Sequence, residues 1–258
     1  MKIGLSSLFL INRSFKELAE CIVNSGVRNW EIVDEGNLKL DKRRVGLLRE
    51  IGNSYDVGYS VHAPFADMNI ASFDDGIRGL MMRKVQASLA NAHELGASLF
   101  VLHPGLWGGI RFAFEDRIRH YGLESIRAMV RQAEELGLTL ALENMPSPLH
   151  FMLETPEDFK RLFGEVDSRI LGITFDVGHA NTQGSVEEFV DKFMDRIVHV
   201  HAHDNDGSYD AHLSIGDGNI DWPQIMKRLV EGKFNGTVVL ETIENPTSDL
   251  DKLKRYVR

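Results

Sequence analysis

At residues 196–201 the chain reads RIVHVH, a β-branched run that ends on His201. Five other apolar runs also end on a residue that can bind a metal or transfer a proton. They are VGYSVH (57–62), SLFVLH (98–103), LTLALE (138–143), ILGITFD (170–176) and GTVVLE (236–241), which end on His62, His103, Glu143, Asp176 and Glu241. In chain order, the six end residues lie 41, 40, 33, 25 and 40 positions apart, about the length of a strand, a loop and a helix. The spacing predicts a β/α repeat in which each of these strands ends on a reactive side chain.

Eight β/α units can be traced along the 258 residues, which is the usual length of a (β/α)8 barrel. Strands are expected at 2–6, 29–33, 57–62, 98–103, 138–143, 170–176, 197–203 and 236–241. Amphipathic helices are expected at 14–25, 41–54, 77–95, 115–136, 156–164, 185–194, 222–231 and 248–257. An open doubly wound sheet is the alternative, but it usually has a glycine-rich first turn, and SSLFLINRS at 6–14 contains no glycine. We therefore predict an α/β fold, a TIM barrel that forms a single domain over residues 1–258.

The composition indicates a globular protein that does not hold nucleic acid mainly through phosphates. A formal net charge of −9 gives no sign of a broad basic face, although bound cations would add positive charge at a site. No apolar run approaches the roughly 18 residues that a membrane span needs, and residues 1–7 resemble a strand more than a signal peptide. We expect a cytoplasmic protein without a membrane partner, in which the lone cysteine, Cys21, packs within a helix.

Side chains of a barrel strand point alternately to the surrounding helices and to the barrel interior. In the run 197–203 this alternation places the histidines inside and Val198, Val200 and Ala202 against the helices. His199 and His203 are expected to pack in the lumen or to support ligands. The layer beneath the reactive ends is expected to contain Ser60, Val101, Ala141, Thr174, His199 and Val239. The reactive ends themselves fall at the carboxyl ends of the strands, where active sites of TIM barrels lie.

Three further candidates lie in predicted loops at the same mouth. They are His179 in FDVGHA (175–180), and Asp210 and His212 in YDAHLSIGDG (209–218). Together with the strand ends they form a donor set that suits zinc, manganese or cobalt. Four carboxylates carry about −4 charge, so one divalent ion leaves about −2, two leave about zero and three give about +2. We expect one to three ions, and their number separates a site for a phosphodiester, which prefers positive charge, from a site for a sugar.

Four residues are weaker candidates for contacting a substrate. Arg111 follows PGLWGG (104–109), where a cation and a flexible backbone suit a phosphate, and a solvated loop arginine is the alternative. Trp107 and Phe65 are able to stack on a sugar or a base, or simply to pack. His203 follows His201 by two residues and is the fourth candidate for contacting a substrate. The remaining histidines have no partner pattern and are expected to be solvated or packed: His93, His120 and His150.

The motifs of the chain resemble those of the xylose isomerase-like TIM-barrel superfamily. They are VHAPF (61–65), LHPG (102–105), LEN (142–144), FDVGH (175–179), HAHDNDG (201–207), DAHLSIGDGNIDW (210–222) and VLE (239–241). This superfamily contains endonuclease IV, of AP endonuclease family 2, and many sugar or sugar-phosphate isomerases and epimerases. The resemblance covers nearly the whole chain and implies a divalent-metal enzyme that acts on a small-molecule sugar or sugar phosphate, or on DNA.

The endonuclease IV pattern implies three metals, and all nine of its ligand positions are filled in this chain. The first metal would take His62, His103 and Glu143; the second would share Glu143 and add Asp176, His201 and Glu241; the third would use His179, Asp210 and His212. In the isomerase and epimerase branch, a single metal is held by the residues that match Glu143, Asp176, His201 and Glu241.

The chain departs from endonuclease IV in the surroundings of these ligands. Its first strand reads IGLSSLF (3–9) instead of a sequence of the GAHVS type. The loop after the second strand, EIVDEGNLKLD (31–41), is acidic instead of DNA-contacting, and Asp34, Glu35 and Asp41 would repel a phosphate backbone. The loop after the third strand, APFADMNIAS (63–72), does resemble the nuclease family. The ligands thus favour the nuclease, and the surroundings as a whole do not.

Two mechanisms and one non-catalytic role therefore remain open. An isomerase or epimerase would hold adjacent sugar oxygens on a metal, and Glu143 and Glu241 would remove and return the proton of the carbon between them. A phosphodiesterase acting at abasic sites would use the metals to generate hydroxide, with Glu143 as a bridging ligand. A metal-binding or sensor barrel without turnover is the third reading. The isomerase or epimerase is the favoured one.

Overall fold

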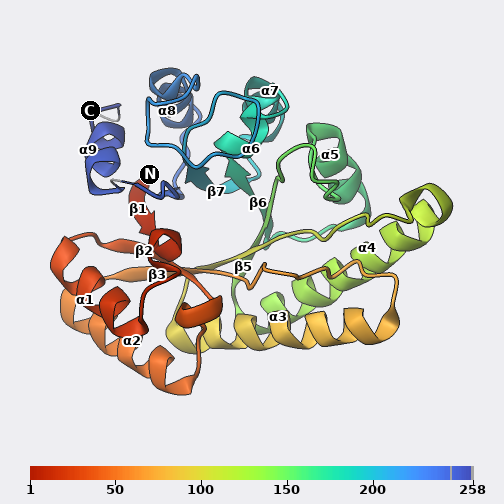
Figure 1. The fold of residues 1–258 in the computed structure, drawn as a ribbon, viewed down its shortest axis with the longest axis horizontal. Coiled ribbons are helices and arrows are strands. Elements are labelled where there is room, and N and C mark those ends of the chain that lie inside the picture. The colour runs from red at the N-terminus through yellow and green to blue at the C-terminus, as the bar shows by residue number, and fades with distance from the viewer. Residues whose placement is uncertain (245, 257–258) are drawn as a thin grey trace.

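The computed structural model describes residues 1–244 and 246–256, and it shows a closed barrel of eight parallel strands (Figure 1). The strands are β1 (Lys2–Ser6), β2 (Asn29–Val33), β3 (Gly58–His62), β4 (Leu99–Leu102), β5 (Thr139–Glu143), β6 (Leu171–Asp176), β7 (Ile197–Ala202) and β8 (Thr237–Leu240). Each strand pairs with the next along the chain, and β8 pairs with β1. The predicted (β/α)8 barrel is confirmed, and the open sheet is excluded.

The helices form a layer outside the strands. They are α1 (Phe15–Ser25), α2 (Lys42–Tyr55), α3 (Asp75–Leu95), α4 (Arg111–Leu136), α5 (Pro156–Glu165), α6 (Val177–Asn181), α7 (Val186–Phe193), α8 (Trp222–Glu231) and α9 (Pro246–Tyr256), with short 3-10 helices η1 (Ser7–Leu10) and η2 (Gly36–Leu38). Helix α4 begins earlier than predicted, α6 was not expected, and residue 257, where the last predicted helix ends, lies outside the described residues. No helix within residues 1–244 and 246–256 is both long and apolar enough to cross a membrane.

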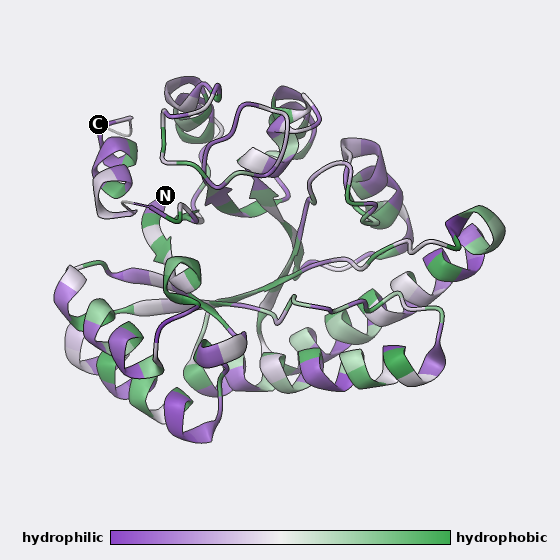
Figure 2. Ribbon diagram, viewed as in Figure 1, coloured by the Kyte–Doolittle hydropathy of each residue, from purple (hydrophilic) through white to green (hydrophobic). Residues whose placement is uncertain are grey.

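The main hydrophobic core lies between the strands and this helical layer. Its largest side chains include Trp30, Phe100, Phe159 and Phe175, each at most 1% exposed. Burial of one such side chain contributes roughly 1.5–3 kcal/mol, so this layer supplies most of the driving force for folding. Figure 2 shows apolar and polar residues alternating along α1, α2 and α3, as expected for helices that bury one face.

Local signals in the sequence explain where several helices begin and end. Ser14 and Glu17 form a capping box at the start of α1, in which each side chain binds the other residue's backbone N–H. Gly26, Gly96 and Gly137 end α1, α3 and α4 with left-handed φ angles of 68°, 79° and 70°. These caps hold the helices at fixed lengths, and thereby fix where each following strand begins.

The alternation along β7 is interrupted by a β-bulge. A register shift between β6 and β7 leaves Val198 as an extra residue ahead of the three histidines. Val198 packs against a cluster inside the barrel that includes Val101 and Ala141. The prediction that Val198 faces the helices is therefore wrong, whereas Val200 and Ala202 lie in the outer core as predicted.

Candidate metal centre

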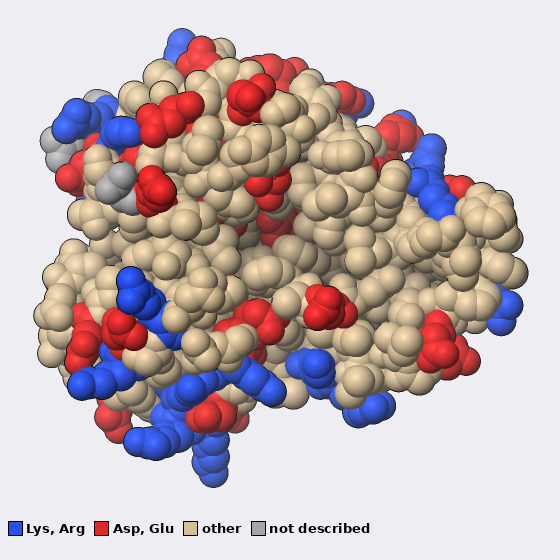
Figure 3. Space-filling view, viewed as in Figure 1, with Lys and Arg blue, Asp and Glu red and all other residues tan. Residues whose placement is uncertain are grey.

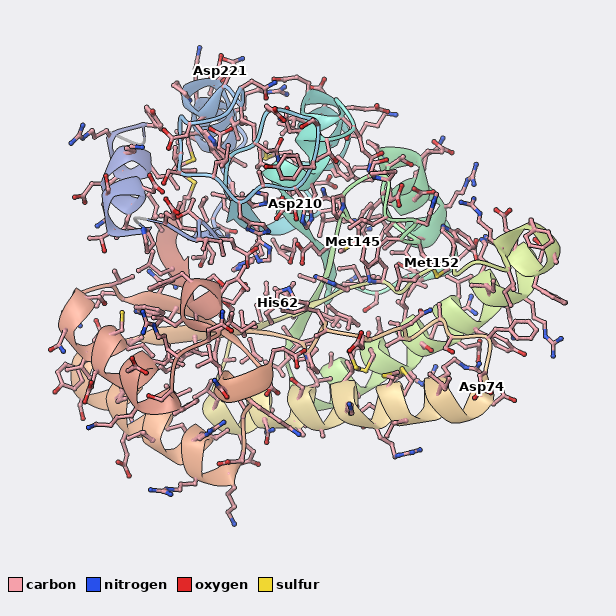
Figure 4. The ribbon with its side chains drawn as sticks, in the orientation of Figure 1. His62, Asp74, Met145, Met152, Asp210 and Asp221 are labelled. Atoms are coloured by element: carbon pink, nitrogen blue, oxygen red, sulfur yellow. The ribbon has the colours of Figure 1, made fainter. Side chains whose placement is uncertain are left out.

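The carboxyl ends of the strands open into a pocket of about 410 Å³. Figure 3 shows a hollow at the centre of this face, with acidic side chains at its floor. His62, Met145 and Asp210 lie around the opening in Figure 4, whereas Asp74 and Asp221 lie at the periphery of the molecule. The pocket is therefore at the end of the barrel where catalytic residues of this fold gather.

The first group of candidate ligands joins the ends of β3, β4 and β5. Nε2 of His62 and Nε2 of His103 each lie 3.2 Å from Oε2 of Glu143. Nδ1 of His62 lies 2.8 Å from the carbonyl oxygen of Ala63, so this nitrogen is the donor and Nε2 keeps the lone pair that can bind a metal. The side chain of His103 is 21% exposed, so the group opens to the pocket.

The second group lies deeper, among the ends of β5, β6, β7 and β8. Nδ1 of His201 lies 3.2 Å from Oε1 of Glu143, 3.5 Å from Oε2 of Glu241 and 3.7 Å from Oδ2 of Asp176. Asp176 and His201 are fully buried, and Glu241 is 5% exposed. Three carboxylates this close together and this deeply buried require compensating positive charge.

The third group lies on the loop after β7 and on α6. Nε2 of His179 and Nε2 of His212 each lie 3.2 Å from Oδ2 of Asp210. The ring of His203 stacks on that of His212, with centroids 3.9 Å apart, and its Nε2 lies 3.5 Å from Oδ1 of Asp210. His179 lies on a short helix and not, as predicted, on a loop. Asp176 accepts a 2.7 Å hydrogen bond from the backbone N–H of His179, and this N-cap starts the helix.

Glu143 joins the three groups into one cluster. Its Oε2 faces His62 and His103, whereas its Oε1 faces Nδ1 of His201 and, at 3.3 Å, Nδ1 of His179. The nine residues predicted as ligands therefore all lie in one connected set at the mouth, together with His203.

Opposite charges in this cluster shift several pKa values. Burial alone would raise the pKa of Glu143, but His201 and His103 hold it well below its usual range. Burial would lower the pKa of His179, but Asp176 and Asp210 outweigh this and raise it to about 10. Asp210 likewise raises the pKa of His212 to about 9 against the effect of burial. In the metal-free protein these imidazolium groups supply the positive charge that a bound cation would otherwise supply.

The donor set fits a divalent metal. Within each group, one ligand atom from every side chain lies within 4.8 Å of the others, which is close enough for the side chains to converge on one ion. Oδ1 of Asp210 is buried without a hydrogen-bond partner among the described residues, as expected of an oxygen prepared to bind a cation. Imidazole nitrogens and carboxylate oxygens together suit zinc or manganese.

Glu31 is a buried member of the site that sequence reasoning missed. It lies in the middle of β2, is fully buried, and has carboxylate oxygens 2.9 Å from Nε2 of His201 and 2.8 Å from Nε2 of His199. Ser60, predicted for the layer beneath the site, donates a 3.0 Å hydrogen bond to it. The sequence feature that could have identified it is a glutamate within the apolar run NWEIV. It lies two residues before the strand end, so its side chain points inward.

His203 supports the ligands from behind and does not line the pocket. It is fully buried, and its Nε2 lies 3.1 Å and 3.2 Å from the two carboxylate oxygens of Asp176. Its ring packs against Gly178, where a Cβ would lie 2.0 Å from Cε1 of His203. A glycine is required at this position of α6 because the imidazole occupies the space of a side chain. The structure therefore does not place His203 where it could contact a substrate.

Of the other substrate-contact candidates, only Phe65 lines the pocket. Its ring lies 5.4 Å from that of His62 and 5.6 Å from that of His103. Trp107 is 9% exposed and packs beneath the guanidinium of Arg111, 4.3 Å away, beside a different pocket. Arg111 is the first residue of α4 and pairs with Glu115. The remaining histidines are exposed, as the solvated reading predicts: His93, His120 and His150.

The acidic loop after β2 presents less free charge than its sequence indicates. Asp34 is 5% exposed and accepts a hydrogen bond from a backbone N–H within the loop. Glu35 accepts 3.0 Å hydrogen bonds from the backbone N–H groups of Phe65 and Ala66, and so fixes the loop that carries Phe65. Asp41 caps α2. All three carboxylates stabilise local structure, so the loop argues less strongly against DNA than its composition does.

We predict that Gly178→Ala weakens metal binding. The added methyl group would displace the His203 ring from Asp176, and loss of such a supporting contact typically costs about 10–100-fold in metal affinity. Zinc affinity, measured by competition with a chromophoric chelator, should fall by at least about tenfold. Gly164→Ala, at a helical glycine with no heavy atom within 4 Å of the new Cβ, is the matched control and should leave the affinity unchanged. Equal affinities for the two variants would contradict the role of His203.

We also predict that zinc binding releases protons at pH 7.5. The pKa values of His179 and His212 in the metal-free protein are about 10 and 9, so both imidazoles are protonated there and must lose a proton to become ligands. An indicator dye in weak buffer should report about two more protons released by the wild type than by the double variant His179→Asn, His212→Asn. Equal release by both proteins would show that the third group takes no metal.

Comparisons with known proteins agree with the fold. The family model for the xylose isomerase-like TIM barrel matches residues 20–257. An uncharacterized protein of Methanocaldococcus jannaschii is 36% identical over 262 aligned positions, covering 100% of this chain and 89% of the relative. The crystal structure of a D-tagatose 3-epimerase-like protein superimposes with a TM-score of 0.94 at 35% identity, covering 100% of this chain and 97% of that one. A probable endonuclease 4 of Mycoplasmoides gallisepticum is 26% identical over 228 positions, covering 81% of this chain and 73% of the relative.

The closed barrel, the ligand groups at its mouth and these matches over most of the chain lead to one assignment: the protein belongs to the xylose isomerase-like TIM-barrel family.

Proposed function

We propose that this protein is a divalent-metal-dependent sugar isomerase or epimerase that abstracts a proton from a carbon next to a sugar oxygen. One observation carries the proposal: the carboxylates of Glu143 and Glu241 belong to the same ligand group at the floor of a pocket of about 410 Å³. Two carboxylates on one small-molecule site are what removal and return of a carbon-bound proton require. The similarity to a D-tagatose 3-epimerase-like protein supports the same chemistry.

The lining of the pocket favours a small and uncharged substrate. Its volume falls in the range of small-molecule sites, which is about 300–1,000 Å³. Above the ligands the walls are apolar, formed by Leu8, Val33, Phe65, Met145, Pro146, Leu149 and Phe151. No lysine or arginine is among the described residues that line it. A phosphate group would find no lysine or arginine there, only the histidines of the ligand groups, so a free sugar fits better than a sugar phosphate or a DNA backbone.

The two glutamates reach the pocket from separate strands. Glu143 ends β5, and Glu241 directly follows β8, so their carboxylates approach the substrate from different sides of the barrel. A divalent cation in the second ligand group would supply Lewis-acid polarisation of a substrate oxygen. One carboxylate then takes the proton of the neighbouring carbon, and the other returns a proton to the opposite face, which inverts that centre. His201 holds the pKa of Glu143 low, so Glu143 is ionised as a base must be.

We predict that Glu143→Gln and Glu241→Gln separate the two proton transfers. In D2O, each variant of the metal-loaded protein should still exchange the proton on the face of its remaining carboxylate, but should invert the centre at least about 100-fold more slowly than the wild type. Proton NMR on a panel of free ketoses checks both quantities. Glu115→Gln, on the exposed start of α4, is the control and should behave as the wild type. Inversion by Glu143→Gln at the wild-type rate would refute the assignment.

Metal-dependent hydrolysis of phosphodiesters is the second candidate function. It is favoured by the complete third ligand group and by Glu143, whose two oxygens face different groups and would suit a bridging ligand. The relation to a probable endonuclease 4 supports it further. If the first and second groups are both filled, neither oxygen of Glu143 remains free to act as a base. Whether a metal ion occupies the first ligand group therefore distinguishes the two candidate functions.

We predict no nicking of duplex DNA at abasic sites by the zinc- or manganese-loaded protein above the level of Glu143→Gln. The same preparations should exchange hydrogen on at least one free ketose. His179→Ala should retain most of the exchange, because the third group is not required for proton transfer. Metal-dependent nicking that is lost in His179→Ala would instead establish the hydrolase.

A further inference from the structure

We propose that Glu31 is a positioning residue that fixes the tautomer and orientation of His201, so that Nδ1 of His201 faces the second ligand group. The inference rests on the metal centre of the proposed function, but not on which reaction that centre performs. Glu31 itself does not line the pocket and reaches the site only through the imidazole.

The two nitrogens of His201 face different parts of the barrel. Nε2 lies 2.9 Å from Oε1 of Glu31, in the layer below the site. Nδ1 lies 3.2 Å from Oε1 of Glu143 and 3.5 Å from Oε2 of Glu241, within the ligand group. A neutral imidazole has one N–H donor and one lone pair. When a metal replaces the proton on Nδ1, the nitrogen that faces the carboxylate of Glu31 stays the donor, and Nδ1 offers its lone pair to the metal.

The carboxylate of Glu31 is itself held at three points. Its Oε2 lies 2.8 Å from Nε2 of His199 and accepts a 3.0 Å hydrogen bond from Oγ of Ser60. Glu31 and His201 are fully buried, and His199 is 2% exposed. Among the described residues, Oε1 of Glu31 and the Nε2 atoms of both histidines have no hydrogen-bond partner, so the close ion-pair contacts between them are the polar contacts that these atoms make. A buried carboxylate without compensating partners is strongly disfavoured, so the two histidine contacts are needed to keep Glu31 in place, and Ser60 adds to them.

Glu31, His199 and His201 also lie close enough together to form another metal site, but the distances favour direct contact. Two ligands of a tetrahedral zinc, each at about 2.0–2.1 Å from it, lie about 3.3 Å apart. The oxygen–nitrogen separations here are 2.8 Å and 2.9 Å, which are typical of charge-assisted hydrogen bonds. Glu31 thus acts on the second ligand group from outside, through His201.

The test combines metal affinity with the tautomer of His201. In Glu31→Gln the amide cannot accept from both rings, so zinc affinity, measured by chelator competition, should fall about 10–100-fold. Glu31→Asp keeps the charge and should recover part of that loss. Ser60→Ala removes a contact to Glu31 but leaves both histidine contacts, and should change the affinity by less than about threefold.

The tautomer is read by nitrogen NMR of the zinc-loaded protein labelled with 15N-histidine, because without metal the effect of burial is outweighed by the neighbouring carboxylates, which raise the pKa of His201 well above its usual range and leave both ring nitrogens protonated. Wild-type His201 should carry its proton on Nε2, and Glu31→Gln should lose this preference. Wild-type affinity in a folded Glu31→Gln variant, or a wild-type His201 protonated on Nδ1 alone, would overturn the inference. If Glu31→Gln does not fold, the wild-type tautomer decides. If the wild type binds no zinc although His201 carries a proton on Nε2, the proposed function is wrong. The inferred role of Glu31 in orienting His201 would not be affected.

Discussion

The carboxylate of Glu143 is the group on which the rest of the site depends. It is 1% exposed, yet it remains ionised because imidazoles surround both of its oxygens. Oε2 faces His62 and His103, and Oε1 faces His179 and His201, so the arrangement requires β3, β5, β7 and α6 to meet at one height. A register slip of one residue in β5 would turn Glu143 toward the helices and leave these histidines without their common partner.

This constraint explains why so much of the site could be predicted from the sequence. In a closed parallel barrel, all strands end at the same mouth, and side-chain alternation has a fixed period of two. A reactive residue at the end of one apolar run must therefore lie near the reactive residues at the ends of the other runs, regardless of the loop conformations. His62, Asp176 and Glu241 come together in the structure for this reason alone. Helix boundaries could also be predicted where the capping residues lie next to the helix in the sequence, as at Ser14.

The features that escaped prediction depend on contacts between segments distant in sequence. Val198 faces the lumen because of a bulge in pairing with β6, which no local pattern in β7 records. Glu31 becomes part of the site only because β2 lies across the barrel from β7. His179 lies on a helix because the side chain of Asp176 caps it while also belonging to the ligand group. Arg111 was expected on a loop, as a solvated residue or as a phosphate contact, but it is the first residue of α4, and the sequence does not fix where that helix begins.

The three ligand groups differ in how much they need a cation, and this difference bears on which chemistry the site supports. In the third group a single carboxylate, Asp210, is balanced by His179 and His212, whose pKa values of about 10 and 9 keep both protonated near neutral pH. The second group has three carboxylates and one imidazole, His201, so protons on its own histidine cannot neutralise it. A first divalent ion would therefore gain most in the second group, where it would supply missing charge and displace a proton only from His201, whose pKa, against the effect of burial, the neighbouring carboxylates raise well above its usual range. With that group alone filled, Oε2 of Glu143 would hold no metal and would lie beside His62 and His103 at the pocket, as the proposed proton abstraction from a sugar requires.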